Sequence, residues 1–201
     1  MKSVWDVRLD DISWEDLRSQ LRSWLVDQEK QVIVTPNAEM LLECRSNNQL
    51  REDLNAADLA VIDTFSVELA LASCGEHMEH SRKPGVDVLL ELLSIAAEVD
   101  RTVGIVGSTN TVAGRAIAYI SRTFNTLDVV WIDIGRVAPD AELSEEIVKK
   151  IDDTECDVLI VALGHGKQER FMQVYKNSVQ TVNLMMGVGG AIDMLGGKVR
   201  R

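Results

Sequence analysis

Long apolar runs are missing from this chain. No stretch approaches the roughly 20 consecutive apolar residues that a transmembrane helix requires. The start of the chain, Met1 to Asp6, lacks the apolar core of a secretory signal peptide. Hydrophobic residues still make up 46% of the 201 positions, enough to bury a sizeable core. We therefore expect a folded protein of the cytoplasm.

Basic side chains are also scarce. Lys and Arg number 21 against 32 Asp and Glu, which gives a formal net charge of −11. This is the wrong sign for a protein that lives mainly on phosphate backbones or anionic lipid. General nucleic-acid binding is disfavoured, and we expect no nucleic-acid partner.

Cysteines are few and scattered. Cys44, Cys74 and Cys156 fit thiols in a reducing compartment better than a disulfide framework. Cys74, His77 and His80 have a C-x-x-H-x-x-H spacing, which offers three zinc-type ligands. A zinc site also needs a second shell, and this stretch has the composition of a polar loop after a helix. We favour the loop and predict no metal.

Short apolar segments alternate with amphipathic segments from end to end. Near-continuous Val, Ile and Leu runs are typical of strands that are covered on both faces. These runs occupy residues 31–35, 59–63, 102–107, 128–132, 157–162 and 181–186. The amphipathic segments include residues 13–28, 86–98, 111–124 and 140–151, the last with Pro139-Asp140 as its predicted helix start. The alternation predicts an α/β fold of Rossmann-like type, mostly parallel, with helices on both faces and two closely packed halves.

Polar and glycine residues collect where the predicted strands end. Such loops follow five of the strands, at residues 35–39, 63–64, 107–110, 164–169 and 187–190. In an open α/β sheet, ligands bind outside the carboxyl ends of the strands. The loops therefore predict one shared crevice.

Two of these loops have alternative interpretations. The segment Gly107-Ser108-Thr109-Asn110 opens a helix, so its backbone N–H groups are suited to a nucleotide phosphate or ribose, although a plain N-capped turn explains it equally well. It matches neither G-x-G-x-x-G nor the Walker loop. The segment Gly164 to Arg170 packs glycines, a cation, an amide and a carboxylate together. Its alternative is a glycine turn followed by a solvated helix face.

Asp63 and Asn37 also have two possible roles each. A carboxylate that emerges from an apolar strand is partly desolvated, which raises its pKa toward that of a useful base. Asp63 fits that description, or it caps a helix that starts near Phe65. Asn37 is a good N-cap, and its amide is also suited to sugar hydroxyl or acetamido groups.

Taken in order, these loops resemble the WecG/TagA/CpsF family of glycosyltransferases. The shared pattern is T-x-N-x-E, an Asp that ends a strand, R-x-x-G-x-D, a glycine turn after a strand, G-x-x-K-Q-E and V-G-G-x-x-D-x-x-x-G with a following basic pair. The matching residues are Thr35, Asn37 and Glu39; Asp63; Arg82, Gly85 and Asp87; Gly107; Gly164, Lys167, Gln168 and Glu169; and Val188 to Asp193, Gly197 and Arg200-Arg201. The resemblance extends from about Trp5 to Arg201.

The resemblance implies an inverting transfer of N-acetylmannosamine, or a related sugar, from its UDP-linked form. The implied acceptor is GlcNAc on an undecaprenyl diphosphate carrier, in teichoic acid or other cell-surface polysaccharide synthesis at the inner face of the membrane. No cofactor is implied, and the absence of a D-x-D triplet agrees with the metal-independent chemistry of the family.

Site residues are carried over from the family motifs. The resemblance implies that Asp63 is the general base and that Thr35 and Asn37 shape the sugar pocket. Arg82 and Gln168 would steady the diphosphate, and the remaining substrate-binding residues are Asp87, Gly107, Gly164, Lys167, Glu169, Gly187, Gly189 and Asp193. Residues 1–101 would carry the base and residues 102–201 the nucleotide site, within a single glycosyltransferase domain.

The chain departs from the family after the base. Asp63 is followed by Thr64-Phe65-Ser66 instead of the usual glycines, and Gly166 replaces a proline. The basic and aromatic C-terminal segment of the family would follow Arg201, so we expect weak turnover and little membrane affinity from these 201 residues.

Two other functions remain as alternatives. The first is a nucleotide-sugar-binding or regulatory module that has lost catalysis. The second is a dinucleotide-dependent oxidoreductase, against which the missing G-x-G-x-x-G argues. Apolar helix faces also permit a homo-oligomer.

Overall fold

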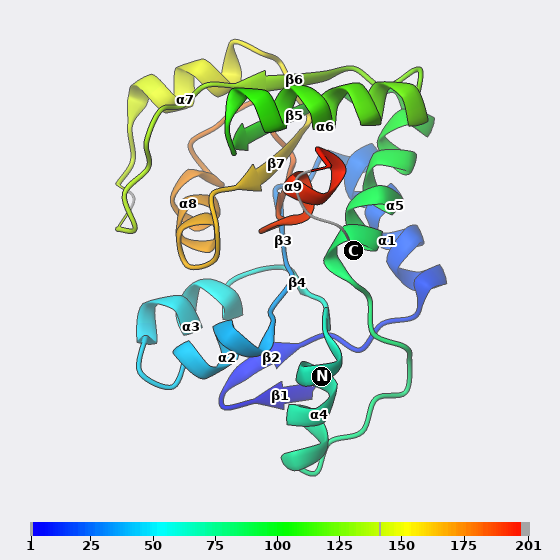
Figure 1. Ribbon diagram of the computed structural model, residues 1–201, viewed down its shortest axis with the longest axis vertical. Coiled ribbons are helices and arrows are strands. Elements are labelled where there is room, and N and C mark those ends of the chain that lie inside the picture. Colours follow the sequence, from blue (N-terminus) through cyan, green and yellow to red (C-terminus); the bar gives the residue numbers. More distant parts are fainter. Residues whose placement is uncertain (1, 141, 198–201) are drawn as a thin grey trace.

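One parallel sheet organises the protein. The computed structural model describes residues 2–140 and 142–197. Six strands form the sheet in the order β4-β3-β8-β7-β5-β6 (Figure 1). Their bounds are β3 (Gln31–Val34), β4 (Leu59–Ala60), β5 (Val103–Gly107), β6 (Val129–Ile132), β7 (Val158–Ala162) and β8 (Leu184–Gly187). Each strand lies within a predicted apolar run or overlaps it, and every pairing is parallel, as predicted.

Strand β8 connects the early and late parts of the chain. It pairs with β3 on one side, where Gln31 lies opposite Leu184, and with β7 on the other, where Val158 lies opposite the same residue. The N-terminal strands β3 and β4 therefore continue the sheet formed by β5 to β8 (Figure 1).

Helices cover both faces of this sheet, which confirms the predicted fold class. Their bounds are α1 (Trp14–Asp27), α2 (Ala38–Glu43), α3 (Asn48–Asn55), α4 (Phe65–Ser73), α5 (Gly85–Glu98), α6 (Asn110–Thr123), α7 (Glu145–Asp152), α8 (Lys167–Tyr175) and α9 (Ala191–Leu195). Helices α1, α5, α6 and α9 pack in one apolar cluster, whereas α2, α3, α4, α7 and α8 pack in another.

Alternate residues of each strand enter opposite clusters. Within β3, Val32 and Val34 belong to the cluster with α8, while Ile33 belongs to the cluster with α5. Successive side chains of a strand point to opposite faces of the sheet. A strand with apolar residues at every position is therefore buried on both sides, which is why the sequence runs lack a polar alternation.

A small hairpin at the N-terminus was not predicted. Strands β1 (Lys2–Val4) and β2 (Val7–Leu9) pair antiparallel around Trp5 and Asp6, whose φ angles are 48° and 63°. Two positive φ values are typical of a type I′ turn, which usually contains Asn or Gly. The turn here contains neither Asn nor Gly, and each strand has only three residues. The sequence pattern therefore gives little indication of a hairpin.

The helix predicted from residue 140 begins later, so that predicted start is wrong. Helix α7 starts at Glu145, after the N-cap Ser144. The Tyr175 hydroxyl donates to the carbonyl oxygen of Glu142 and accepts the N–H of Ser144, each at 3.1 Å. These bonds from α8 hold the preceding segment outside the helix, and they depend on a residue about 30 positions away.

The stretch around His77 is a loop, as predicted. It follows α4, which ends at Ser73, and leads toward α5. Within residues 2–140 and 142–197, no three His, Cys, Asp or Glu side chains are grouped closely enough to hold a metal ion. The helices in the same ranges are all too short or too polar to cross a membrane.

Gly107 supports a stability prediction. Its φ is +83°, and a Cβ at this position would lie 2.4 Å from the carbonyl oxygen of Ala162. We expect Gly107→Ala to lower the free energy of unfolding by about 2 kcal/mol or more, because neighbouring backbone has to shift. Urea unfolding followed by circular dichroism measures this change.

Gly114 provides the matched control. It lies within α6, and a Cβ there would meet nothing within 4 Å. Gly114→Ala should therefore raise stability by roughly 0.5–1 kcal/mol. Equal stability of the Gly107→Ala variant and the native protein would contradict the close approach of β5 and β7.

Candidate active site

A cavity opens at the carboxyl ends of the strands, where the loop positions predict it. Its volume is about 610 Å³. The loops after β3, β4, β7 and β8 line it, together with the segment that precedes α5 and residues of α9. Four of the five predicted loops therefore meet at one crevice, which draws on both the N-terminal and the C-terminal strands, whereas the loop after β5 does not line it.

Eight of the predicted site residues line this cavity. They are Thr35, Asn37, Asp63, Arg82, Gly164, Gln168, Gly189 and Asp193. The other five predicted residues lie outside its lining, and they are Asp87, Gly107, Lys167, Gly187 and Glu169.

Asp63 is fixed by the helix that faces it. One carboxylate oxygen, Oδ1, accepts the backbone N–H of Gly85 at 2.6 Å. Gly85 is the first residue of α5, and Pro84 before it provides no side-chain cap. Asp63 thus satisfies a free N–H at the start of α5. The alternative role as the cap of α4 is wrong, because Thr64 occupies that position.

The environment of Asp63 raises the pKa of its carboxyl group. Burial is the largest cause, and the nearby charge of Asp87 acts in the same direction. The Gly85 N–H and the Arg82 guanidinium oppose the rise because they stabilise the ionised form. A partly desolvated carboxylate with a raised pKa is a better proton acceptor than a solvated one.

Thr35 packs directly against the start of α5. Its side-chain atoms would lie 3.3 Å from a Cβ placed on Gly85. Its Oγ1 also lies 3.4 Å from the carbonyl oxygen of Gly187, to which it donates. Thr35 thereby joins the end of β8 to the segment that holds Asp63, and a Cβ at position 85 would require it to shift slightly.

Asn37 is the N-cap of α2, which confirms the structural interpretation of this residue. Its Oδ1 accepts the N–H of Met40 at 3.0 Å. The same side chain lines the cavity. Capping uses the oxygen of the amide, and no hydrogen bond among residues 2–140 and 142–197 is found for its nitrogen. Asn37 is therefore suited to both of the roles considered for it.

Gln168 and Glu169 lie beneath two of the glycine loops. Gln168 is 2% exposed, and its Oε1 accepts the N–H of Gly189 at 3.0 Å. Glu169 is 0% exposed and accepts the N–H of Gly166 at 2.6 Å. The interpretation of these residues as a solvated helix face is therefore wrong for both.

The loop after β5 borders a smaller hollow. This space of about 110 Å³ is lined by Ser108, Thr109, Ala162, Gly189, Ile192 and Asp193. Ala162, Gly189 and Asp193 also line the main cavity, so the two spaces adjoin. Gly107 itself lies against β7, and its carbonyl oxygen accepts the indole N–H of Trp131 at 3.1 Å.

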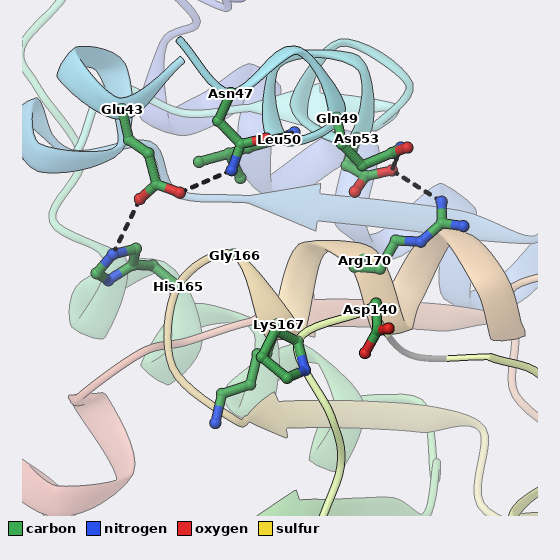
Figure 2. A pocket seen from close by; sticks show the side chains of 11 residues that line it. Glu43, Asn47, Gln49, Leu50, Asp53, Asp140, His165, Gly166, Lys167 and Arg170 are labelled. Atoms are coloured by element: carbon green, nitrogen blue, oxygen red, sulfur yellow. Dashed lines mark hydrogen bonds and ion pairs between the residues drawn. The ribbon is translucent and has the colours of Figure 1, made fainter.

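A second large cavity lies beyond the loop after β7. It measures about 550 Å³ and is bordered by α2, α3 and the start of α8 (Figure 2). Glu43 contacts both Asn47 and His165 there, and Asp53 is paired with Arg170 across the cavity. Lys167 lines this second cavity and His165 lines both. Asp63 lines the main cavity and does not line this second cavity.

Several lining residues carry no clear sequence signal. Met40, Val86, Leu163, Ala191 and Met194 line the main cavity, yet apolar residues of this kind are indistinguishable from core residues in a sequence. His165 lies within the glycine-rich segment that the sequence singles out, and the glycines around it were the only available signal.

A comparison with protein families indicates the activity of the chain. The sequence model of the glycosyl transferase WecG/TagA/CpsF family matches residues 2–201. The chain belongs to this family. The match spans essentially the whole chain, which confirms the resemblance inferred from the loop motifs. The protein is thus a glycosyl transferase of the WecG/TagA/CpsF type, and it requires a sugar donor and an acceptor.

The burial of Asp63 supports a second stability prediction for this WecG/TagA/CpsF family member. Because the pKa is raised in the folded state, the folded protein gains stability as the pH falls through that pKa, and the ionised carboxylate lowers stability at neutral pH. Asparagine is neutral and keeps an oxygen for the Gly85 N–H. We expect Asp63→Asn to leave the melting temperature at pH 7 unchanged or higher.

Asp63→Ala is the comparison for that measurement. Alanine leaves the buried Gly85 N–H without its acceptor, so the free energy of unfolding should fall by about 1–3 kcal/mol. If Asp63→Asn proves as unstable as Asp63→Ala at pH 7, the carboxylate charge stabilises the fold and the predicted sign is wrong.

Proposed function

We propose that this protein transfers N-acetylmannosamine, or a related sugar, from UDP to GlcNAc on an undecaprenyl diphosphate carrier. The product would enter teichoic acid or other cell-surface polysaccharide synthesis. The observation that carries the proposal is the Asp63 carboxylate, which is partly desolvated and lines a cavity of sugar-accommodating size in a member of a glycosyltransferase family.

Asp63 acts as the general base in the proposed reaction. Its Oδ1 is held by Gly85, which leaves Oδ2 to take the proton from the attacking acceptor hydroxyl. The hydroxyl oxygen bonds to the anomeric carbon of the donor sugar as the bond from that carbon to the UDP oxygen breaks. Attack from the face opposite UDP inverts the configuration at that carbon. The raised pKa of Asp63 favours this proton transfer.

Arg82 is the cation proposed to stabilise the departing UDP. It is exposed to the cavity, and its Nη1 lies 3.4 Å from the backbone carbonyl oxygen of Asp63. Negative charge develops on the diphosphate as the sugar leaves, and a preorganised guanidinium stabilises that charge. Thr35 and Asn37 are proposed to contact the sugar between Arg82 and the loop after β8.

The uridine diphosphate is proposed to occupy the side of the cavity formed by residues 102–197, while residues 2–101 supply the base. The adjoining hollow at Ser108 and Thr109 supports this assignment, because Thr109 caps the 14-residue helix α6. Glycines at 164 and 189 allow a ligand to approach the backbone closely.

An apolar hollow supports a lipid-linked acceptor. It measures about 320 Å³, and its lining includes Trp5, Leu42 and Leu69. It lies between α2 and α4, the two helices that begin directly after the cavity residues Asn37 and Thr64. Phe65 and Leu69 of α4 are 65% and 61% exposed. A polyprenyl carrier whose sugar reaches Asp63 therefore has apolar surface available nearby, which fits action at the inner face of the membrane.

Nucleotide binding is the first prediction of this function. A ligand at 100 times its Kd stabilises a protein by about 2.7 kcal/mol. We expect UDP and UDP-linked N-acetylhexosamines to raise the melting temperature, and NAD to leave it unchanged. A shift with NAD alone would favour the oxidoreductase instead.

Loss of the base is the second prediction. Asp63→Asn should lower kcat by about 10²- to 10⁴-fold, the usual contribution of a general base. In the native protein kcat/KM should fall as the pH drops through the raised pKa of Asp63, so this acid limb should lie above about 3.9, the ordinary aspartate value. Initial rates of UDP release over a pH series measure both effects.

The same assay separates transfer from binding alone. A protein that binds UDP-sugar but gives no Asp63-dependent UDP release with a lipid-linked acceptor is the catalytically impaired binding module that the Thr64-Phe65-Ser66 departure raises as an alternative.

A further inference from the structure

Two consecutive side chains of α8 join the loop after β7 to the loop after β8. Gly189 donates its N–H to Gln168 Oε1 at 3.0 Å. The Nε2 of Gln168 then donates to Glu169 Oε1 at 2.8 Å, and the other carboxylate oxygen, Oε2, accepts the N–H of Gly166 at 2.6 Å. Three hydrogen bonds thus run in one line from Gly166 to Gly189.

The direction of these bonds matches the chemistry of each group. Both backbone N–H groups are donors, so both ends of the line require acceptors. The centre needs one donor and one acceptor, which the Gln168 amide nitrogen and a Glu169 oxygen provide. A carboxylate beside an amide meets this requirement, whereas two amides or two ionised carboxylates do not.

Glycine conformations make the line possible. Gly166 and Gly189 have φ angles of +77° and +49°, values that favour glycine. At Gly187 a Cβ would lie 3.0 Å from the Gln168 Nε2 and 2.9 Å from the Met172 methyl group. The line of hydrogen bonds from Gly166 to Gly189, which we call the bridge, therefore passes through space that a side chain at position 187 would fill.

Glu169 is buried despite the cost of burying a carboxylate. It is 0% exposed, and burial raises its pKa, which its bonds to Gln168 and Gly166 partly offset. An apolar residue would fill the same space at lower cost, but it would leave the Gly166 N–H without this acceptor. The arrangement thus favours a specific loop geometry over maximal stability.

We propose that Gln168 and Glu169 are positioning residues that set the spacing of the two glycine loops and thereby the shape of the donor side of the cavity. Gly164, His165, Gln168 and Gly189 line that cavity, whereas Glu169 does not, so Glu169 acts through Gly166 and Gln168. The part that concerns the donor rests on the proposed function. The part that concerns the loops does not.

Exchanging the two residues provides the test. Glu169→Gln places two amides side by side and leaves one N–H of the line without an acceptor in either amide orientation. Gln168→Glu places two carboxylates side by side. The double variant Gln168→Glu/Glu169→Gln restores one amide and one carboxylate, so all three hydrogen bonds can form again with their direction in the centre reversed. Its net charge equals that of the native protein.

Amide hydrogen exchange is the readout that needs no ligand. We expect each single variant to speed exchange at Gly166 or Gly189 by about tenfold or more, the factor expected when a buried hydrogen bond is lost. In Glu169→Gln the cause is an N–H of the line that lacks an acceptor, and in Gln168→Glu it is the repulsion of two ionised carboxylates, which displaces the acceptors. The double variant should return to within about threefold of the native rates. Glu146→Gln, an exposed change on α7, is the control for charge loss.

Kinetics extend the test to the donor. Each single variant should raise KM for the UDP-sugar more than it lowers kcat, and the double variant should recover most of that KM. If a single variant fails to fold, the double variant still tests the proposal, because the proposal predicts that the double variant folds and that its Gly166 and Gly189 amides exchange slowly. The proposal would be overturned if amide exchange at Gly166 and Gly189 were as fast in the double variant as in the single variants.

The two proposals fail in different ways. If UDP-sugars do not bind but the exchange rates follow the expected order, the bridge stands and the proposed donor is wrong. If exchange is restored in the double variant while donor KM stays high, Gln168 or Glu169 contacts the donor directly, and the positioning role is overturned.

Discussion

The pairing of β8 with β3 is the interaction on which the site depends. Along the chain, β8 is the last strand of the sheet and β3 is the first. Their pairing places the loop after β8 next to the loops after β3 and β4. Parallel strands carry their carboxyl ends to one edge. Thr35 donates to Gly187 across this junction, and Asp63 and Gly189 line one cavity as a result. Without this pairing, Asp63 and the glycine loops of the late strands would belong to separate surfaces.

Asp63 holds the start of a helix other than the one the sequence suggested, and it also lines the cavity. The carboxylate completes the first turn of α5 through Gly85, and it keeps a second oxygen for chemistry in the proposed mechanism. The helix N–H orients the group, while burial raises its pKa. Thr35 packs closely against Gly85 at this helix start.

The glycine loops illustrate a related principle on the opposite side of the cavity. Gly164, Gly166 and Gly189 have positive φ angles, and freedom of this kind has to be limited if a site is to keep its shape. Backbone N–H groups of two of these loops are tied to buried acceptors on α8. The structure thus combines flexible residues facing the cavity with a fixed polar layer behind them.

The sequence was informative where physical requirements are local. Apolar runs such as residues 157–162 predict buried parallel strands because both faces of such a strand need apolar side chains, and the loops at 35–39 and 187–190 follow from the same alternation. Motif order was sufficient to indicate the WecG/TagA/CpsF family. The start of α7 was not predictable in this way, since Tyr175 decides it from a distant helix.

Sequence alone therefore determined the fold class, the family and four of the loops that line the cavity. Tertiary structure decided how the residues within those loops divide their roles. Asp63 bonds to Gly85, Glu169 is buried behind Gly166, and Lys167 lines the neighbouring cavity. The physical reason is that burial and hydrogen-bond partners depend on segments far apart in the chain, whereas strand and turn propensities depend on near neighbours.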